Sequence, residues 1–117
     1  MYVRHAELTR ILDVDGYEAD LDAAPERGRL RREGTHRTHR VTLEANQCYN
    51  AIAVGNTGVQ NLDLRVRRGA SRVAGDSGFN AFPSVPFCPR HGGIHLIDVT
   101  AVSGSGDYFF QLYRRRE

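Results

Sequence analysis

From about residue 38 onward, hydrophobic and polar residues alternate with a period of two, which is the pattern of half-buried β-strands. The stretch "NLDLRVR" shows it most clearly. Leu62, Leu64 and Val66 fall on one face of it, and the polar residues between them fall on the other. The same reasoning predicts further strands in "HRVTLE", "CYNAIAVGN", "RVAGD", "SVPFCP", "GGIHLIDVTAV" and "YFFQLYRR".

Turn-forming residues separate these segments. "RRGAS" and "SGSGD" each predict a hairpin turn, and in the second turn Gly104 and Gly106 can adopt positive φ at low cost. "SGFNAFP" predicts a loop, and the prolines of "SVPFCP" place that strand at a sheet edge. About six to eight short strands with frequent turns predict an all-β fold, an antiparallel β-sandwich, with a closed barrel as the alternative.

The closing hairpin is apolar on both faces. In its last strand Tyr108, Phe110 and Leu112 share one face, while Phe109 and Tyr113 share the other. We expect one face to pack in the core and the other to be covered by the N-terminal arm or by a partner.

The N-terminal part of the chain lacks this alternation. Residues 5–13, "HAELTRILD", predict a short amphipathic helix with its leucines and isoleucine on one face. Residues 13–34 are polar and predict a connecting arm with weak strand character near "GRLRREG". We therefore divide the chain into an N-terminal arm, residues 1–26, and a β-sandwich domain, residues 27–117.

Charge divides the chain at the same place. Residues 1–26 carry two Arg and seven acids, a net charge of −5, whereas residues 27–117 carry fourteen Arg and seven acids, a net charge of +7. We expect the arm to dock on the basic body or on a neighbouring copy. All sixteen basic residues are Arg, which excludes Lys-dependent Schiff-base and P-loop chemistry.

The chain of 117 residues is long enough for one domain with a hydrophobic core. No apolar run approaches the roughly 18 residues of a membrane span. The stretch "MYVRHAELTRILDVDG" is charged and periodic, unlike a signal peptide. A removed signal peptide, an excised domain and an intracellular protein are the three alternatives.

The two cysteines, Cys48 and Cys88, each adjoin a predicted strand. An even number is compatible with a single disulfide, which would close a loop of about 40 residues and stabilise the fold by about 4 kcal/mol in the chain-entropy model. The alternative is two unpaired, buried thiols in a cytosolic protein.

Three longer stretches carry a family resemblance. "GRLRREGTHRTHRVTLEANQCYNAIAVG" has the layout of a first hairpin leading into Cys-Tyr, "VQNLDLRVRRGASRVAGD" that of an Asp-x-Asp-Leu strand with its turn, and "PFCPRHGGIHLIDVTAVSGSGDYFFQLYRR" that of a closing hairpin. In this order they resemble the bacterial pre-peptidase C-terminal domain family, and more closely its myxobacterial secreted versions. The resemblance covers residues 28–114, and residues 1–26 have no counterpart in it.

The resemblance implies a jelly-roll-like β-sandwich that serves as a non-catalytic accessory module of secreted enzymes, often proteases. Some members bind collagen or other polymers, and some bind calcium. It implies a secreted or cell-surface location, and together with the pairing argument it favours a Cys48–Cys88 disulfide. Asn61 stands where the family usually has Asp, and His95 where it usually has an aromatic residue, which weakens any transfer of a metal site.

Four acidic residues, Asp13, Asp15, Asp63 and Asp76, are candidate calcium ligands, because hard cations bind carboxylate oxygens. The first two belong to the acidic run "DVDGYEADLD", whose spacing does not match an EF-hand. The alternatives are structural: an Asx-turn at Asp76, an ion pair between Asp63 and a nearby Arg, and a solvated acidic arm. We expect no cofactor other than calcium.

No catalytic residue can be assigned from the sequence. There is no G-x-S-x-G elbow. His36 and His39 are three apart in an extended segment and should point to opposite faces. His91 and His95 have no free cysteine to complete a zinc site if the disulfide forms. The sequence therefore predicts a protein that is not an enzyme and holds no transition metal.

Arg65, Arg67, Arg68 and Arg72 cluster around one predicted hairpin and are a candidate contact surface. The Tyr and Phe residues are concentrated in the last strand and not interleaved with these arginines, so nucleic acid is not the expected partner. The alternatives are contact with an acidic polysaccharide or other polyanion, and a solvated face that pairs with the acidic arm.

Three hypotheses for the function follow. The first is a non-catalytic accessory or binding module of a secreted bacterial protein, which contacts a protein or polysaccharide surface or a parent enzyme. The second is a self-assembling structural subunit whose arm docks on a neighbouring sandwich. The third, a calcium-dependent hydrolase module, rests only on the acidic run and the histidines.

Overall fold

The structure is a computed structural model that describes residues 16–20 and 25–116, and these form nine β-strands. The strands are β1 (Tyr17–Ala19), β2 (Glu26–Leu30), β3 (His36–Leu43), β4 (Tyr49–Gly55), β5 (Val59–Arg68), β6 (Ser71–Asp76), β7 (Ser84–Phe87), β8 (Gly93–Gly104) and β9 (Gly106–Arg115). Every strand predicted from the alternating pattern is present. Among the described residues, no helix is long and apolar enough to span a membrane.

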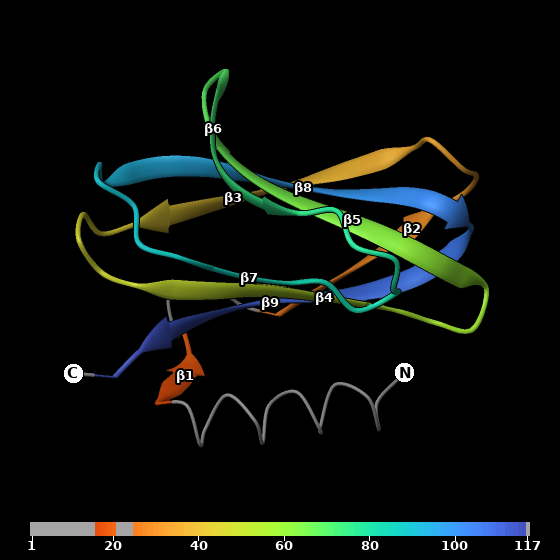
Figure 1. The fold of residues 1–117 in the computed structure, drawn as a ribbon, viewed down its shortest axis with the longest axis horizontal. Coiled ribbons are helices and arrows are strands. Elements are labelled where there is room, and N and C mark those ends of the chain that lie inside the picture. Colours follow the sequence, from red (N-terminus) through yellow and green to blue (C-terminus); the bar gives the residue numbers. More distant parts are fainter. Residues whose placement is uncertain (1–15, 21–24, 117) are drawn as a thin grey trace.

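Two antiparallel sheets face each other and make a β-sandwich (Figure 1). In sheet A the order is β2-β9-β4-β7, and β1 also pairs with β9. In sheet B the order is β3-β8-β5-β6. From β2 onward, successive strands change sheet except at the β5–β6 hairpin, which gives the strand order of a jelly roll. The predicted jelly-roll-like β-sandwich is therefore confirmed.

The main core lies between the sheets and is built by the inward-facing residues of the alternating strands. Leu62, Leu64 and Val66 of β5 are at most 1% exposed, as their alternation predicts. They belong to one apolar cluster with Phe110 and Leu112 of β9. Burying a side chain of this size stabilises the fold by about 2 kcal/mol. The alternation of apolar residues therefore favours packing the two sheets face to face.

A second apolar cluster lies on the outer face of sheet A. Ile52 and Val54 of β4 and Tyr113 of β9 are buried there, and Tyr17 and Ala19 of β1 pack against them. The closing strand is thus apolar on both faces, as predicted. The described part of the N-terminal arm contributes to covering the second face.

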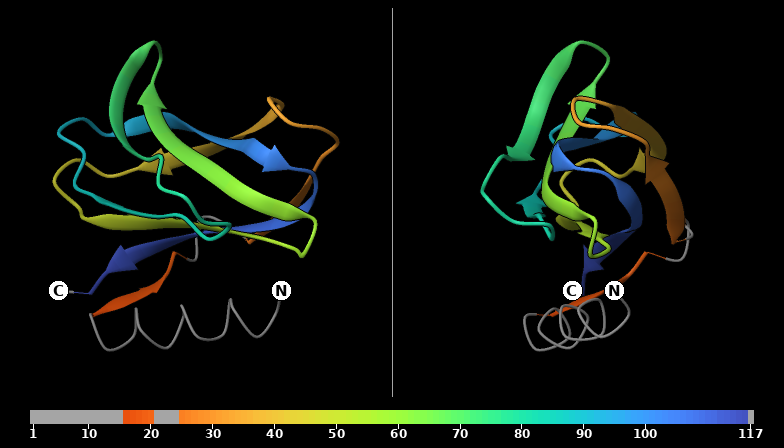
Figure 2. Two further views of the ribbon diagram at one scale, coloured as in Figure 1. Left: turned by 45° about the vertical axis from the view of Figure 1, so that its right-hand side comes forward. Right: turned by 90° about the vertical axis from the view of Figure 1, so that its right-hand side faces the viewer.

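Strand pairing joins the N-terminal arm to the sandwich. β1 pairs with residues 113–115 and β2 with residues 106–110, so both lie along one edge of β9 (Figure 2). β2 corresponds to the weak strand expected near "GRLRREG", whereas β1 has only three residues, too few for a periodic pattern to reveal. The helix predicted at residues 5–13 lies outside the described residues.

The turns and edges follow from glycine and proline. Gly69 has a φ of 59° in the β5–β6 turn, and Gly104 and Gly106 have φ values of 82° and 147° at the β8–β9 turn. β7, which contains Pro86, lies at the edge of sheet A beside β4, as predicted. The β5–β6 hairpin extends beyond the body of the sandwich (Figures 1 and 2).

Candidate functional site

A cleft of about 400 Å³ lies between the β5–β6 hairpin of sheet B and the segment that follows β7 of sheet A. The hairpin contributes Arg68 and Arg72, and the segment after β7 contributes Arg90 and His91. The ring of His95 on β8, only 1% exposed, also lines it. We refer to the cleft defined by these five residues as the basic cleft.

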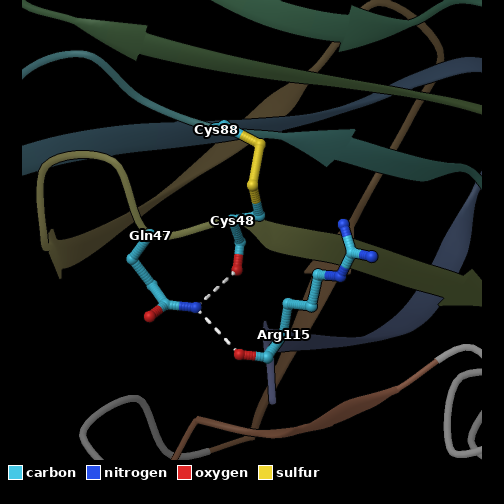
Figure 3. The surroundings of a disulfide bond; sticks show 4 residues. All are labelled: Gln47, Cys48, Cys88 and Arg115. Atoms are coloured by element: carbon cyan, nitrogen blue, oxygen red, sulfur yellow. Dashed lines mark hydrogen bonds between the residues drawn. A yellow bond between two sulfur atoms is a disulfide. The ribbon is translucent and has the colours of Figure 1, made fainter. Parts of the chain in front are cut away.

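A disulfide fixes the wall of the basic cleft that carries Arg90. Cys48 precedes β4 and Cys88 follows β7, and the two are bonded with their Cα atoms 4.1 Å apart (Figure 3). The predicted disulfide is therefore confirmed. The adjoining Pro89 carbonyl accepts a hydrogen bond of 2.8 Å from the Asn46 backbone N–H. Arg90 thus follows two residues that are anchored to the chain before β4.

The other side of the disulfide is tied to β9. The side-chain amide of Gln47 donates to the Cys48 carbonyl at 3.1 Å and to the Arg115 carbonyl at 2.9 Å (Figure 3). The Arg115 N–H in turn donates to the Cys48 carbonyl at 2.9 Å. The ends of β4, β7 and β9 therefore form one connected unit behind this wall.

The three arginines of the basic cleft make no ion pair with any acid in the part of the chain that the structure describes. Other arginines do: Arg114 lies 3.1 Å from Glu44, for example. Like charges gathered in one cleft repel one another. An anionic group entering the cleft would relieve that repulsion and meet several guanidinium groups at once.

The other half of the predicted basic surface is engaged within sheet B. Arg65 and Arg67 lie 3.1 and 2.8 Å from Asp98 on the neighbouring β8. The hydroxyl of Thr38 on β3 donates to the same carboxylate at 2.7 Å. Burial by itself raises the pKa of Asp98, but the hydrogen bonds from Arg67, Thr38 and Arg65 outweigh it and lower the pKa to about 2. These two arginines therefore have a structural partner that those of the basic cleft lack.

Asp76, a predicted calcium ligand, serves the backbone of the loop after β6. One of its oxygens accepts the Gly78 N–H at 2.9 Å and the other accepts the Ser84 N–H at 3.2 Å. This is the Asx-turn alternative that the sequence offered.

Asp63 is the other predicted calcium ligand within the described residues. Burial raises the pKa of Asp63, and the charge of Asp76 raises it further. Asp63 makes none of the ion pairs expected with Arg65 or Arg67, because Asp98 takes them.

A calcium site stays a prediction for the described residues. Asp13 and Asp15 lie outside them, and within the described ranges no three His, Cys, Asp or Glu side chains form a metal-binding group. On β5, Asp63 and the buried Asn61 Oδ1, which accepts no hydrogen bond, are the side-chain oxygens left over. Calcium takes six to eight oxygen ligands, so a site here would also need backbone carbonyls or water.

A chain of polar contacts, buried at His39 and Tyr108, links the two sheets. His39 of β3 contacts Glu26 of β2 through Nδ1 and the hydroxyl of Tyr108 on β9 through Nε2, each at 2.5 Å. Because the carboxylate only accepts, the Nδ1–H of His39 donates to Glu26. Tyr108 is fully buried, and burial raises its pKa to about 12. These contacts tie β2 and β9 of sheet A to β3 of sheet B.

The histidines divide as their positions predict, with one addition. His36 is exposed and His39 is buried, consistent with opposite faces of one strand. His91 and His95 instead line the same cleft. Sequence reasoning missed Arg90, because nothing along the chain shows that the segment after β7 faces the β5–β6 hairpin. The only available signal was that Arg90 closely follows a cysteine expected to be tied down.

The fold and the cleft define the chain as a small, disulfide-containing jelly-roll domain. No protein-family model and no curated protein matches its sequence. Among solved structures it is similar to the pre-peptidase C-terminal domain of a collagenase from Bacillus anthracis, with a TM-score of 0.64 and 11% identity over 77% of this chain and 88% of that one. This likeness shows a fold like that of a pre-peptidase C-terminal domain.

Weaker structural similarities include two carbohydrate-related proteins. The C-terminal CBM6 of LamC, a laminarinase from Zobellia galactanivorans, has a TM-score of 0.44 and 11% identity over 87% of this chain and 94% of that one. A family two carbohydrate esterase from Cellvibrio japonicus has a TM-score of 0.45 and 12% identity over 85% of this chain and 33% of that one.

Proposed function

We propose that this chain is a non-catalytic accessory or binding module that acts outside the cell. Its partner would be a protein or polysaccharide surface, or a parent secreted enzyme, contacted through the basic cleft. The observation that carries the proposal is the set of three cleft arginines without an ion pair among the described residues, one of them on a wall anchored by a disulfide. A preformed site loses little conformational entropy on binding, which favours recognition by such a cleft.

Two further observations support the proposal. A disulfide is typical of proteins in oxidising compartments, which fits an extracellular location. The fold is that of a domain attached to a collagenase in its structural neighbour, where it is named as a C-terminal domain rather than the peptidase itself. Because fold alone does not fix function, the cleft carries more weight than the likeness.

Retention on immobilised polymers tests the proposal. The panel consists of neutral dextran, polygalacturonate, dextran sulfate, polyglutamate and gelatin. The double variant Arg68→Gln/Arg90→Gln removes two charges from the basic cleft. Its matched control, Arg31→Gln/Arg32→Gln, removes two exposed charges from the β2–β3 connection, which does not line the cleft.

We expect at least one member of the panel to retain the wild type and the control, and to retain the cleft variant at least tenfold less. A loss of general charge would weaken both variants equally, whereas loss of a site weakens one. If no member retains the wild type, or if both variants bind as well as the wild type, the proposed function is wrong.

A further inference from the structure

We infer that the basic cleft binds an acidic polysaccharide, whose carboxylate or sulfate groups are held by the guanidinium groups of Arg68, Arg72 and Arg90. This inference rests on the proposed function, since it names the class of partner for the same cleft. It follows from the charge of the lining, its continuation along the hairpin and the mixture of side chains within it.

The charge and donor geometry of the basic cleft select an anion. A guanidinium group presents a planar fork of N–H donors that matches the paired oxygens of a carboxylate or sulfate. Arg68 comes from the hairpin and Arg90 from the segment after β7, so an anion between the two walls receives donors from both. No acid among the described residues forms an ion pair with these arginines, so none of these acids competes with the incoming anion.

The positive surface continues beyond the cleft, which favours a polymer over a single ion. Arg72 also lines a smaller cavity of about 150 Å³ together with Arg65 and Arg67. Those two arginines share one carboxylate, Asp98, so a net positive charge remains there. A chain with a negative group on successive units can occupy the cleft and the hairpin together, and each added contact strengthens binding.

The neutral part of the lining fits a sugar ring. Ser71 provides a hydroxyl, and Val73 and Pro89 provide apolar surface beside the arginines. Sugar units carry hydroxyl groups together with apolar C–H faces, so they use all three kinds of side chain, whereas a bare inorganic anion uses only the donors. The volume of about 400 Å³ lies within the range of pockets that bind small ligands. A folded protein partner would need a contact of about 800 Å² on each side, so the cleft suits a sugar unit better than a protein surface.

An acidic polypeptide is the competing partner, and the structure favours it less. Its carboxylates sit on side chains with several rotatable bonds, which lose entropy when they are fixed in a cleft. The carboxylate of a uronic acid is attached directly to a rigid ring and loses less. We therefore expect polysaccharide to bind more tightly than a polypeptide of equal charge.

A second basic cavity on the molecule lacks free cations of this kind. It has a volume of about 390 Å³ and lies against β2 and β9. Of the arginines that line it, Arg29 lies 3.8 Å from Asp107, and Arg37 hydrogen-bonds to Tyr108. Its cations already have polar partners, so it is not the site that we propose.

Affinity electrophoresis in gels that contain a soluble polymer tests the inference. The polymers are polygalacturonate as the carboxylate probe, dextran sulfate as the sulfate probe, neutral dextran, and polyglutamate as the polypeptide probe. We expect polygalacturonate or dextran sulfate to bind the wild type at least tenfold more tightly than neutral dextran and polyglutamate. The stronger of the two identifies the anionic group. Affinity should fall as salt is raised, because exposed charges are screened.

The cleft variant Arg68→Gln/Arg90→Gln is expected to lose at least tenfold in affinity for the preferred polysaccharide, while Arg31→Gln/Arg32→Gln stays within threefold of the wild type. The single variants Arg68→Gln and Arg90→Gln, each checked by thermal denaturation, guard against misfolding of the double variant. If polyglutamate or neutral dextran binds best and this binding needs the cleft, the inference is wrong and the proposed function survives. If no binding depends on the cleft, both are wrong.

Discussion

At the scale of single residues, Asp98 shows how one carboxylate can hold three strands together. It lies on the central strand β8 and receives hydrogen bonds from Thr38 of β3 and from Arg65 and Arg67 of β5. Its side chain is only 6% exposed, so losing its charge would leave two arginines without their partner. The position therefore couples the stability of sheet B to pH.

We expect Asp98→Asn to lower the free energy of unfolding by about 2 kcal/mol near pH 7, because the native pKa falls from 3.8 to about 2. Since the native pKa is lowered, this stabilisation is present above the unfolded pKa and is lost as pH falls through the native one. Urea denaturation of both proteins should therefore show a difference that shrinks between about pH 4 and pH 2. A difference that stays constant down to about pH 2 would contradict this. Asp107→Asn, an exposed carboxylate, is the control.

Asp76 distinguishes a loop-forming role from a metal-binding one. Asp76→Ala removes the acceptor for the Gly78 and Ser84 N–H groups, and we expect it to cost about 1–3 kcal/mol of stability. Because both oxygens already accept hydrogen bonds, calcium should not raise the melting temperature of the wild type through this residue. Thermal denaturation with calcium and with a chelator measures this. A calcium-dependent rise in the wild type that is absent from the variant would restore Asp76 as a ligand.

Gly28 leaves room for the buried tyrosine. A Cβ atom at this position would lie 2.4 Å from the ring carbon Cζ and from the hydroxyl of Tyr108. We expect Gly28→Ala to destabilise the fold by about 1–3 kcal/mol, because the ring must move away from its hydrogen bond with His39. The same substitution in a Tyr108→Leu background should cost less, since the end of the ring is gone. Equal costs in the two backgrounds, measured by chemical denaturation, would exclude the clash.

At the scale of elements, the disulfide determines how firmly the edge strand β7 is held. β7 has only four residues and pairs with β4 alone, and Cys88 follows it directly. The wall of the basic cleft that carries Arg90 and His91 begins directly after Cys88. β7 forms few hydrogen bonds because it is short and because proline has no N–H to donate. The disulfide thus stabilises this edge of the sheet.

We expect Cys48→Ser/Cys88→Ser to lower the free energy of unfolding by about 2–4 kcal/mol, since a loop of about 40 residues is no longer closed. Hydrogen exchange should rise mainly in β7 and in residues 88–91, while the paired strands β5 and β8 stay protected. Wild-type protein treated with a reductant is the control and should behave like the variant. Unchanged exchange in β7 would show that strand pairing alone secures this edge.

At the scale of the whole molecule, the described part of the arm is paired with the body of the same chain. β1 lies within the arm and β2 begins at its last residue, Glu26, and both strands pair with β9 of the same chain. The edge of β9 that a neighbouring copy would need is therefore occupied along most of its length. This intramolecular pairing speaks against the self-assembling alternative for the described part of the arm.

We therefore expect the full chain to be a monomer by light scattering at both low and high salt. Attraction between an acidic arm and a basic neighbour would weaken as salt screens it, so self-assembly would appear as a mass that rises at low salt. A variant carrying Glu18→Gln and Glu26→Gln, which removes two negative charges from the described arm, should be a monomer like the wild type. Two results would instead favour exchange of the arm between copies: a dimer that dissociates at high salt, or a wild-type dimer that becomes a monomer in this variant.

The sequence predicted the sandwich well because each strand carries its own evidence. Alternation places Leu62 and Leu64 inward whatever the neighbouring strand is, and the glycines mark the turns. β1 was not predicted, because three residues are too few to show an alternating pattern. The basic cleft was half predicted. Arg68 and Arg72 are near one another in sequence, but Arg90 joins them only through the packing of two sheets.

By itself, the sequence determined the strands from β3 onward and their inward faces, because these depend on local periodicity. It favoured a disulfide between the two cysteines, which the structure confirms. The tertiary structure decided which charges are free. The arginines of the hairpin and of the segment after β7 look equivalent along the chain, yet Asp98 forms ion pairs with only two of them, Arg65 and Arg67. Ion pairing depends on distances across strands, and jelly-roll strands that are adjacent in space come from distant parts of the sequence.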